Sequence, residues 1–219
     1  MIIFVFVNRA LLVLLLVMLP QMARAQDQTP TDAGAWTGIA LRHDFSPRYN
    51  LTLRAENRSK DNFSKTDIWF LRAFNRYKFL PWLTGEFNLE FNNTDIGDDA
   101  WRRSFRVHVG GIASCKLGDF RLSTMQREYF FVITNVEPVS MHFLLSNFRV
   151  GYAPAGWAVS PYLSGFWLFR PDLFQRRLVA GLDYEISSSL STNIYYMYKT
   201  AYPSEKSTNI LGLGLTVKI

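Results

Sequence analysis

Charged residues of both signs alternate with apolar residues along two segments of the chain. In the first, Arg54, Glu56 and Arg58 share one face of an extended strand, because successive side chains of a strand point to opposite sides. In the second, Glu86 and Glu90 share a face in the same way. The chemistry that such faces offer is ion pairing between guanidinium and carboxylate groups.

A turn centred on Pro81 predicts which of these groups meet. Antiparallel pairing about that turn sets Arg76 across from Glu86 and Arg72 across from Glu90, on one face of the sheet. Arg121 and Arg127 add charge on a later strand. We expect the polar network to line the inside of a barrel and to comprise Arg54, Glu56, Arg58, Arg72, Arg76, Glu86, Glu90, Arg106, Arg149, Asp183 and Glu185.

Two functions fit a charged interior of this kind. A barrel of about eight to ten strands has little internal room, so its inward charges pair with one another and fill it. Alternatively, the same residues line a narrow polar pore or a binding site for a small charged solute. The filled interior is favoured, because acidic and basic residues are interleaved and not segregated by sign.

Residues suited to catalysis are sparse. The chain has no G-x-S-x-G, H-E-x-x-H or P-loop motif and no Cys/His cluster with metal-ligand spacing, so no metal, cofactor or enzymatic activity is expected. The three histidines, His43, His108 and His142, lie on well-separated predicted strands. One enzymatic alternative stays open, a lipid hydrolase on the barrel wall that combines His142 with Ser146 or Ser140.

The elements that must position these residues are β-strands. The last segment shows the pattern best, since five apolar residues from Leu211 to Ile219 alternate with Gly, Gly, Thr and Lys. Such alternation is typical of a strand with lipid on one side and a polar lumen on the other. No helical period of comparable strength appears. Strands are predicted at 35–44, 49–58, 66–79, 82–93, 102–115, 119–131, 141–153, 158–169, 175–186, 189–200 and 208–219.

The predicted fold is all-β, an antiparallel up-and-down transmembrane β-barrel of about 10 to 12 strands. The alternation yields eleven candidates, whereas bacterial single-chain barrels have an even number, so we expect one candidate to be merged, missed or incomplete. Short connections alternate with longer, more polar ones, as periplasmic turns and external loops do in outer-membrane barrels. Aromatic residues near the predicted strand ends, Trp36, Trp82, Trp157 and Tyr162 among them, are expected in interfacial girdles.

The first 25 residues have the organisation of a cleavable secretory signal. Met1 to Arg9 carries a positive charge, an apolar stretch runs from Ala10 to Leu19, and small residues precede a cleavage site near Ala25. The apolar stretch is shorter than the roughly 20 residues that a bilayer span needs. We expect a signal peptide at 1–25, a short segment at 26–34 and a barrel domain at 35–219, in the outer membrane of a Gram-negative bacterium.

Charge and cysteine content argue against two other classes. The 24 Lys and Arg of the whole chain, less Arg9 and Arg24, leave 22 against 18 Asp and Glu. Because these basic residues are spread singly, nucleic-acid binding is not expected. Cys115 is the only cysteine, which excludes an intramolecular disulfide, so stability has to come from the closed hydrogen-bonded sheet.

Four segments together resemble one family. They are the opening strand at Trp36, the Leu-Arg-Ala-Glu-Asn-Arg strand at 53–58, the strand at 177–184 and the closing Leu-Gly-Leu-Gly-Leu at 211–215. They resemble the exported barrels called domain of unknown function 2490. The resemblance implies an outer-membrane barrel without an assigned activity and carries over no catalytic residues. One departure is the final Ile219, where many outer-membrane barrels end in Phe or Trp.

The sequence therefore predicts a monomeric outer-membrane barrel of unassigned specific role, structural or partner-binding. The expected partners are outer-membrane lipid, the barrel-insertion machinery and a partner at the external loops. Alternatives are a narrow pore for small polar solutes, a barrel-wall lipid hydrolase and a soluble secreted barrel that binds an apolar ligand. The last inverts the faces, with Leu51, Leu53, Phe87, Leu89, Leu211 and Leu213 inside and Arg54, Glu56, Glu86 and Glu90 in solvent.

Overall fold

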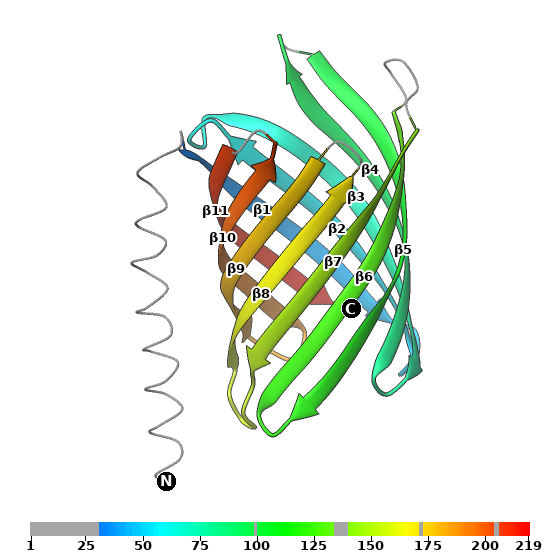
Figure 1. Ribbon diagram of the computed structural model, residues 1–219. Coiled ribbons are helices and arrows are strands. Elements are labelled where there is room, and N and C mark those ends of the chain that lie inside the picture. The colour runs from blue at the N-terminus through cyan, green and yellow to red at the C-terminus, as the bar shows by residue number, and fades with distance from the viewer. Residues whose placement is uncertain (1–30, 99, 134–139, 171–172, 204–205) are drawn as a thin grey trace. The chain divides into compact units, whose positions relative to one another are not determined.

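The structure is a computed structural model that describes residues 31–98, 100–133, 140–170, 173–203 and 206–219. These residues form one closed barrel of eleven strands, which confirms the predicted all-β class (Figure 1). No helix among them has the length and apolarity needed to span a bilayer. The strands are β1 (Thr31–Asp44), β2 (Tyr49–Lys60), β3 (Lys65–Leu80), β4 (Leu83–Gly97), β5 (Ala100–Leu117), β6 (Phe120–Ile133), β7 (Ser140–Tyr152), β8 (Val159–Arg170), β9 (Leu173–Glu185), β10 (Leu190–Tyr202) and β11 (Lys206–Lys218).

The barrel occupies the compact unit Asp32–Ile219. It therefore begins slightly earlier than the predicted boundary at residue 35. The predicted signal peptide at 1–25, and residues 26–30 of the segment that follows it, lie outside the described residues.

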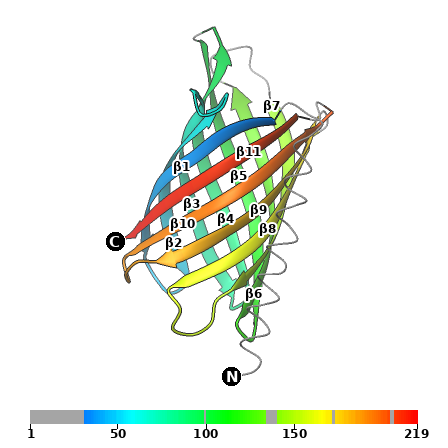
Figure 2. The same ribbon diagram turned by 90° about the vertical axis from the view of Figure 1, so that its left-hand side faces the viewer.

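Each strand pairs with its neighbours in sequence, and β11 closes the sheet against β1. The ten successive pairs from β1 to β11 are antiparallel, so β1 and β11 run in the same direction, as Figure 2 shows. The expectation of an even strand number is wrong. A parallel seam also satisfies backbone groups, and Ile219 N donates to Arg42 O across it at 2.9 Å.

The two ends of the barrel are named here by their connections. The turn end joins β1 to β2, β3 to β4, β5 to β6, β7 to β8 and β9 to β10, and the loop end holds the other five connections. Among the described residues, the longer loop predicted at 94–101 is largely strand, because polar segments continue the ladder there. The β4–β5 ladder extends to Gly97 opposite Ala100 and projects beyond the other strands (Figures 1 and 2). Gly97 has φ of 89°, a conformation that a tight turn needs and glycine tolerates.

The outer wall of the barrel is apolar. Leu53, Phe87, Leu89, Leu211 and Leu213 are 37 to 58% exposed, and Leu51 lies on the same face of β2 by alternation. This arrangement contradicts the inverted, soluble barrel, since Glu56, Glu86 and Glu90 are buried inside. Other exposed apolar residues complete a belt around the wall: Ile39, Leu41, Leu71, Phe105, Val109, Phe148, Leu163, Leu178, Leu182 and Ile194.

Only some of the aromatic residues expected in girdles face outward. Trp82 and Trp157 are exposed near the turn end, as predicted. Trp36 and Tyr162 instead point into the lumen. The guanidinium carbon of Arg58 lies 3.7 Å from the ring centre of Trp36, and that of Arg149 lies 3.6 Å from the ring centre of Tyr162. Each ring covers a partly buried arginine, and the alternation of side chains along β1 and β8 places both rings on the lumen side.

Aromatic and aliphatic side chains fill the lumen along β6 to β11. One buried cluster contains Tyr162, Val179, Met197 and Ile210, with Trp36, Phe166 and Tyr195 packed against it; a second contains Tyr129, Leu145 and Leu168. Glycines opposite the large rings make room for them. Tyr195 is paired with Gly212, where a Cβ atom would lie 1.9 Å from the tyrosine ring. Alternating large and small residues thus close this half of the barrel.

Candidate functional site

The most buried carboxylate of the lumen, Glu90 on β4, is held by three donors. The register sets it opposite Arg72, the pairing that the turn at Pro81 predicts, and Arg72 Nε donates to Glu90 Oε2 at 2.5 Å. From β5, Arg106 Nη1 lies 3.1 Å from Glu90 Oε1, and Asn92 Nδ2 donates to the same oxygen at 3.2 Å. Glu90 is only 1% exposed, so its charge is compensated entirely within the lumen.

Glu86 lies on β4, four residues nearer the turn end than Glu90, and its carboxylate connects β4 with β3 and β6. Arg76 lies opposite it on β3, with Nε 3.4 Å from Oε2. Arg127 reaches Glu86 Oε1 at 2.5 Å from β6, across the intervening β5. The residue between them in the sheet is Gly110, where a Cβ atom would lie 2.4 Å from the carbonyl oxygen of Gln126. Because the glycine has no side chain, the arginine can reach across β5. The alternation of polar and apolar residues does not predict this contact.

Glu56 on β2 forms its ion pairs within its own strand. Arg54 Nη2 lies 2.6 Å from Glu56 Oε2, and Arg58 Nε lies 2.7 Å from Oε1. The three residues share one face, as alternation predicts. The Arg58 guanidinium is sandwiched further by aromatic rings, since its carbon lies 3.7 Å from the Trp36 ring centre and 4.8 Å from that of Phe70.

This part of the lumen carries more positive than negative charge. Around the three glutamates lie six arginines, an excess of three positive charges: Arg54, Arg58, Arg72, Arg76, Arg106 and Arg127. Aromatic faces offset part of the excess, because the electron-rich face of a ring attracts a guanidinium. The Arg72 guanidinium carbon lies 4.6 Å from the Phe70 ring centre, and that of Arg76 lies 5.2 Å from the Phe74 ring centre.

Several polar side chains in the middle of the barrel are almost completely buried. Phe70, Asn88, Asn92, Ser104 and His108 are at most 1% exposed. His108, one of the three histidines that lie on separate strands, belongs to this layer, and its Nε2 is 3.8 Å from Glu90 Oε2. These side chains come from β3, β4 and β5, on one side of the lumen, and their near-complete burial requires other side chains to cover them, so the lumen is filled at this level.

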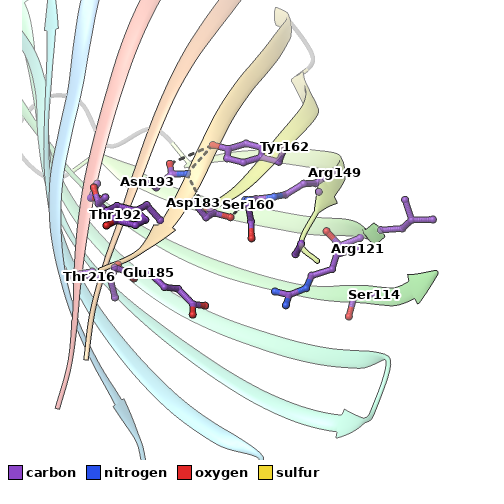
Figure 3. A pocket seen from close by; sticks show the side chains of 18 of the residues that line it. Ser114, Arg121, Arg149, Ser160, Tyr162, Asp183, Glu185, Thr192, Asn193 and Thr216 are labelled. Carbon is purple, nitrogen blue, oxygen red and sulfur yellow. Dashed lines mark hydrogen bonds and ion pairs between the residues drawn. The ribbon is translucent and has the colours of Figure 1, made fainter. Parts of the chain in front are cut away.

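The remaining predicted lumen residues lie nearer the turn end, around a cavity of about 700 Å³ that we call the cup (Figure 3). Arg149, Asp183 and Glu185 line the cup, whereas Glu90 and its partners do not. Sequence reasoning placed these charges in the lumen but did not predict an open space among them. The polar and charged side chains of the cup are Arg54, Ser114, Lys116, Arg121, Ser123, Arg149, Ser160, Tyr162, Asp183, Glu185, Ser191, Thr192, Asn193 and Thr216.

The deepest polar contacts of the cup involve Asp183. Its carboxylate pairs with Arg149 from two strands away and accepts a hydrogen bond from Asn193 Nδ2 at 2.7 Å. Asn193 Nδ2 also donates to the Tyr162 hydroxyl at 3.1 Å, and the Arg149 guanidinium covers the Tyr162 ring. Glu185 is exposed, two residues nearer the rim. The floor of the cup is therefore ordered by hydrogen bonds, while its rim is open to solvent.

The candidate hydrolase residues lie on the outer wall. His142 Nε2 is 3.6 Å from Glu128 Oε2, an arrangement that could orient a general base. Ser146, however, donates its hydroxyl to Gln126 Oε1 at 2.6 Å. It lies four residues along the same strand from His142, a separation of about 13 Å. The side chain of Ser140 lies outside the described part of the chain. The described residues thus assemble no nucleophile–base pair.

Metal ligation and comparison with known proteins leave the site without an assignment. Within the described ranges, no group of three His, Cys, Asp or Glu side chains could hold a metal ion. No family model, curated protein or solved structure matches the chain. Function is therefore inferred from the geometry of the chain itself.

Proposed function

We propose that this chain is an outer-membrane β-barrel with a closed lumen, and that it serves a structural or partner-binding role and not as an open channel. The observation that carries the proposal is the layer of paired charged side chains around the buried Glu90, inside an apolar outer wall. Ion pairs stabilise such an interior only where nearly every charge has a partner, as Glu90 has. Enzymatic activity is not expected, because no serine side chain that the structure describes contacts the His142–Glu128 pair.

The apolar belt supports membrane insertion. Exposed side chains such as Leu71, Ile194 and Leu211 cover the outside of the wall from one strand to the next. A contiguous apolar surface of this extent is not stable in water, whereas lipid solvates it without cost. The belt, together with the export signal expected at 1–25, favours the outer membrane of a Gram-negative bacterium. Lipid and the insertion machinery would be its first partners.

We further propose that the chain belongs with the exported barrels of domain of unknown function 2490. The four segments that carry the resemblance all lie in strands, namely β1, β2, β9 and β11. Of these strands, β1 and β11 form the seam where the barrel closes, β2 lies next to β1, and β9 is separated from β11 by β10. The barrel would act as a monomer. Its projecting β4–β5 hairpin would then be the surface that an external partner contacts.

Conductance in planar bilayers tests whether the lumen is closed. The purified protein is folded into vesicles, its folded state is verified by a band whose gel mobility changes on boiling, and the same vesicles are fused to the bilayer. We expect no conductance beyond leak, because the Glu90 layer leaves no water path. Stepwise openings from the folded protein would instead establish the narrow pore.

A further inference from the structure

Two cations of the cup face each other without a counterion. Lys116 on β5 lies directly opposite Arg121 on β6, and both line the cavity and are exposed. Like charges at directly opposed positions of an antiparallel pair destabilise the sheet. Among the residues that the structure describes, neither makes an ion pair. The other two cations of the cup differ, since Arg54 is paired with Glu56 and Arg149 with Asp183.

The space beside these cations is open. The next residue in the sheet beyond Arg121 is Gly151, and a Cβ atom there would have no neighbour closer than 3.8 Å. Arg149, two residues from Gly151 on β7, points into the same cavity (Figure 3). Three cationic groups from β5, β6 and β7 thus border one solvent-accessible volume. A phosphate group placed there would compensate Lys116 and Arg121 together.

The part of the cup wall formed by β8, β10 and β11 offers many hydrogen-bonding groups. Ser160, Asn193 and Thr216 line it from β8, β10 and β11, with Glu185 exposed at the rim (Figure 3), and Ser191 of β10 also lines it. Carboxylate and amide oxygens accept hydrogen bonds from hydroxyl groups, and serine and threonine hydroxyls both donate and accept. This wall therefore suits a ligand with several hydroxyl groups. A volume of about 700 Å³ falls within the usual range of small-molecule sites.

We propose that the cup binds a small phosphorylated polyol of the sugar-phosphate class, which enters from the turn end. Lys116 and Arg121, assisted by Arg149, hold the phosphate group. The hydroxyl groups contact the wall of Ser160, Ser191, Asn193 and Glu185. This inference adds a ligand to the closed barrel of the proposed function, and it depends on the cup alone and not on where the barrel resides.

Calorimetric titration of the folded protein with glucose 6-phosphate, in a sugar-free zwitterionic detergent, tests the proposal. We expect saturable binding that weakens as salt is added, and weaker binding of glucose or inorganic phosphate alone. Lys116→Gln and Arg121→Gln should each lower the affinity by about tenfold, because each removes a charge-assisted hydrogen bond. The matched control is Arg48→Gln, an exposed arginine of the β1–β2 turn outside the cup, which should bind as the parent does.

Folding is checked separately by the change of gel mobility on boiling. Removal of one of two facing like charges should leave the unfolding midpoint of Lys116→Gln and Arg121→Gln unchanged or raised. Loss of affinity in these well-folded variants, with the control unaffected, supports the cup as the site. No binding by the parent protein, or equal affinity in both variants and parent, overturns the proposal without bearing on the closed barrel. Binding of phosphate and glucose 6-phosphate with equal affinity would contradict the sugar-recognising wall.

Discussion

At the residue scale, Glu90 is the carboxylate on which the middle of the barrel depends most. Two arginines and an asparagine donate to it, and it has almost no exposure to solvent. The Arg72–Glu90 pair could be predicted, because it follows from a local turn and an alternation of two. The contact of Arg127 with Glu86 could not, because it spans a strand whose glycine had no visible role in the sequence.

Glu90→Gln should destabilise the barrel by about 3–5 kcal/mol. The substitution keeps the size of the side chain but leaves the largely buried Arg72 and Arg106 around a neutral amide, and an uncompensated charge inside the protein carries this cost. Urea unfolding of the vesicle-folded protein, followed by tryptophan fluorescence, measures it. The matched control is Glu185→Gln at the exposed rim, which should change the free energy of unfolding by less than about 0.5 kcal/mol. Equal effects of both substitutions would contradict the role given to Glu90.

Gly212→Ala should also destabilise the barrel, by about 1–3 kcal/mol, because the methyl group would overlap the Tyr195 ring and force it out of its cluster. The same change at Gly214 provides the control, since the nearest atom to a Cβ there is Arg54 Nη2 at 3.8 Å. The two glycines lie on the same face of β11, so strand propensity is matched. Similar unfolding midpoints for the two variants would show that the lumen is less tightly filled than the structure indicates.

At the element scale, the seam between β1 and β11 is the feature that alternation could not predict. Strand positions came close because lipid and lumen impose a period of two on every strand. The eleven candidates match the eleven strands observed, and only the expected even count was wrong, since an even count presupposes antiparallel closure. Strand ends were also missed at the loop end, where polar residues resemble a loop but continue the backbone ladder. Ladder hydrogen bonds do not depend on side-chain polarity, so composition misplaces such ends.

Charged groups reinforce the seam at the turn end. Asp44, the last residue of β1, accepts from Arg42 Nε at 2.8 Å and lies 2.9 Å from Lys218 Nζ on β11. The hydrogen bond from Lys218, and then that from Arg42, lowers the pKa of the Asp44 carboxyl below its ordinary value. Asp44 lies at the rim, so water screens the pairs and their contribution is less than about 1 kcal/mol.

A carboxyl with a lowered pKa in the folded state stabilises the protein above its ordinary pKa, and that stability is lost as the pH falls through the folded-state value. The unfolding midpoint should therefore decrease as the pH is lowered below about 4. Asp44→Asn should remove part of this decrease and lower the midpoint at neutral pH. Urea titrations at several pH values for both proteins measure the difference. An identical pH dependence in the variant would exclude Asp44 as a contributor to the seam.

At the scale of the whole molecule, the barrel separates an apolar exterior from an interior that is closed in the middle and open as a cup at the turn end. The separation of faces could be predicted from the sequence, since each strand carries it. The level of each charge along the barrel axis could not, because it depends on the stagger of eleven strands. For that reason Glu90 and Asp183 seemed to belong to one network, whereas the structure places them in two.

Fractionation of cells that express the full chain, with the gel mobility of the mature protein compared before and after boiling, tests whether the apolar belt faces lipid. We expect enrichment in the outer membrane and a band that shifts on boiling, because a closed transmembrane barrel resists detergent until it is heated. A protein that remains in the soluble periplasmic fraction, with the same mobility in both samples, would contradict the lipid-facing role of the apolar belt.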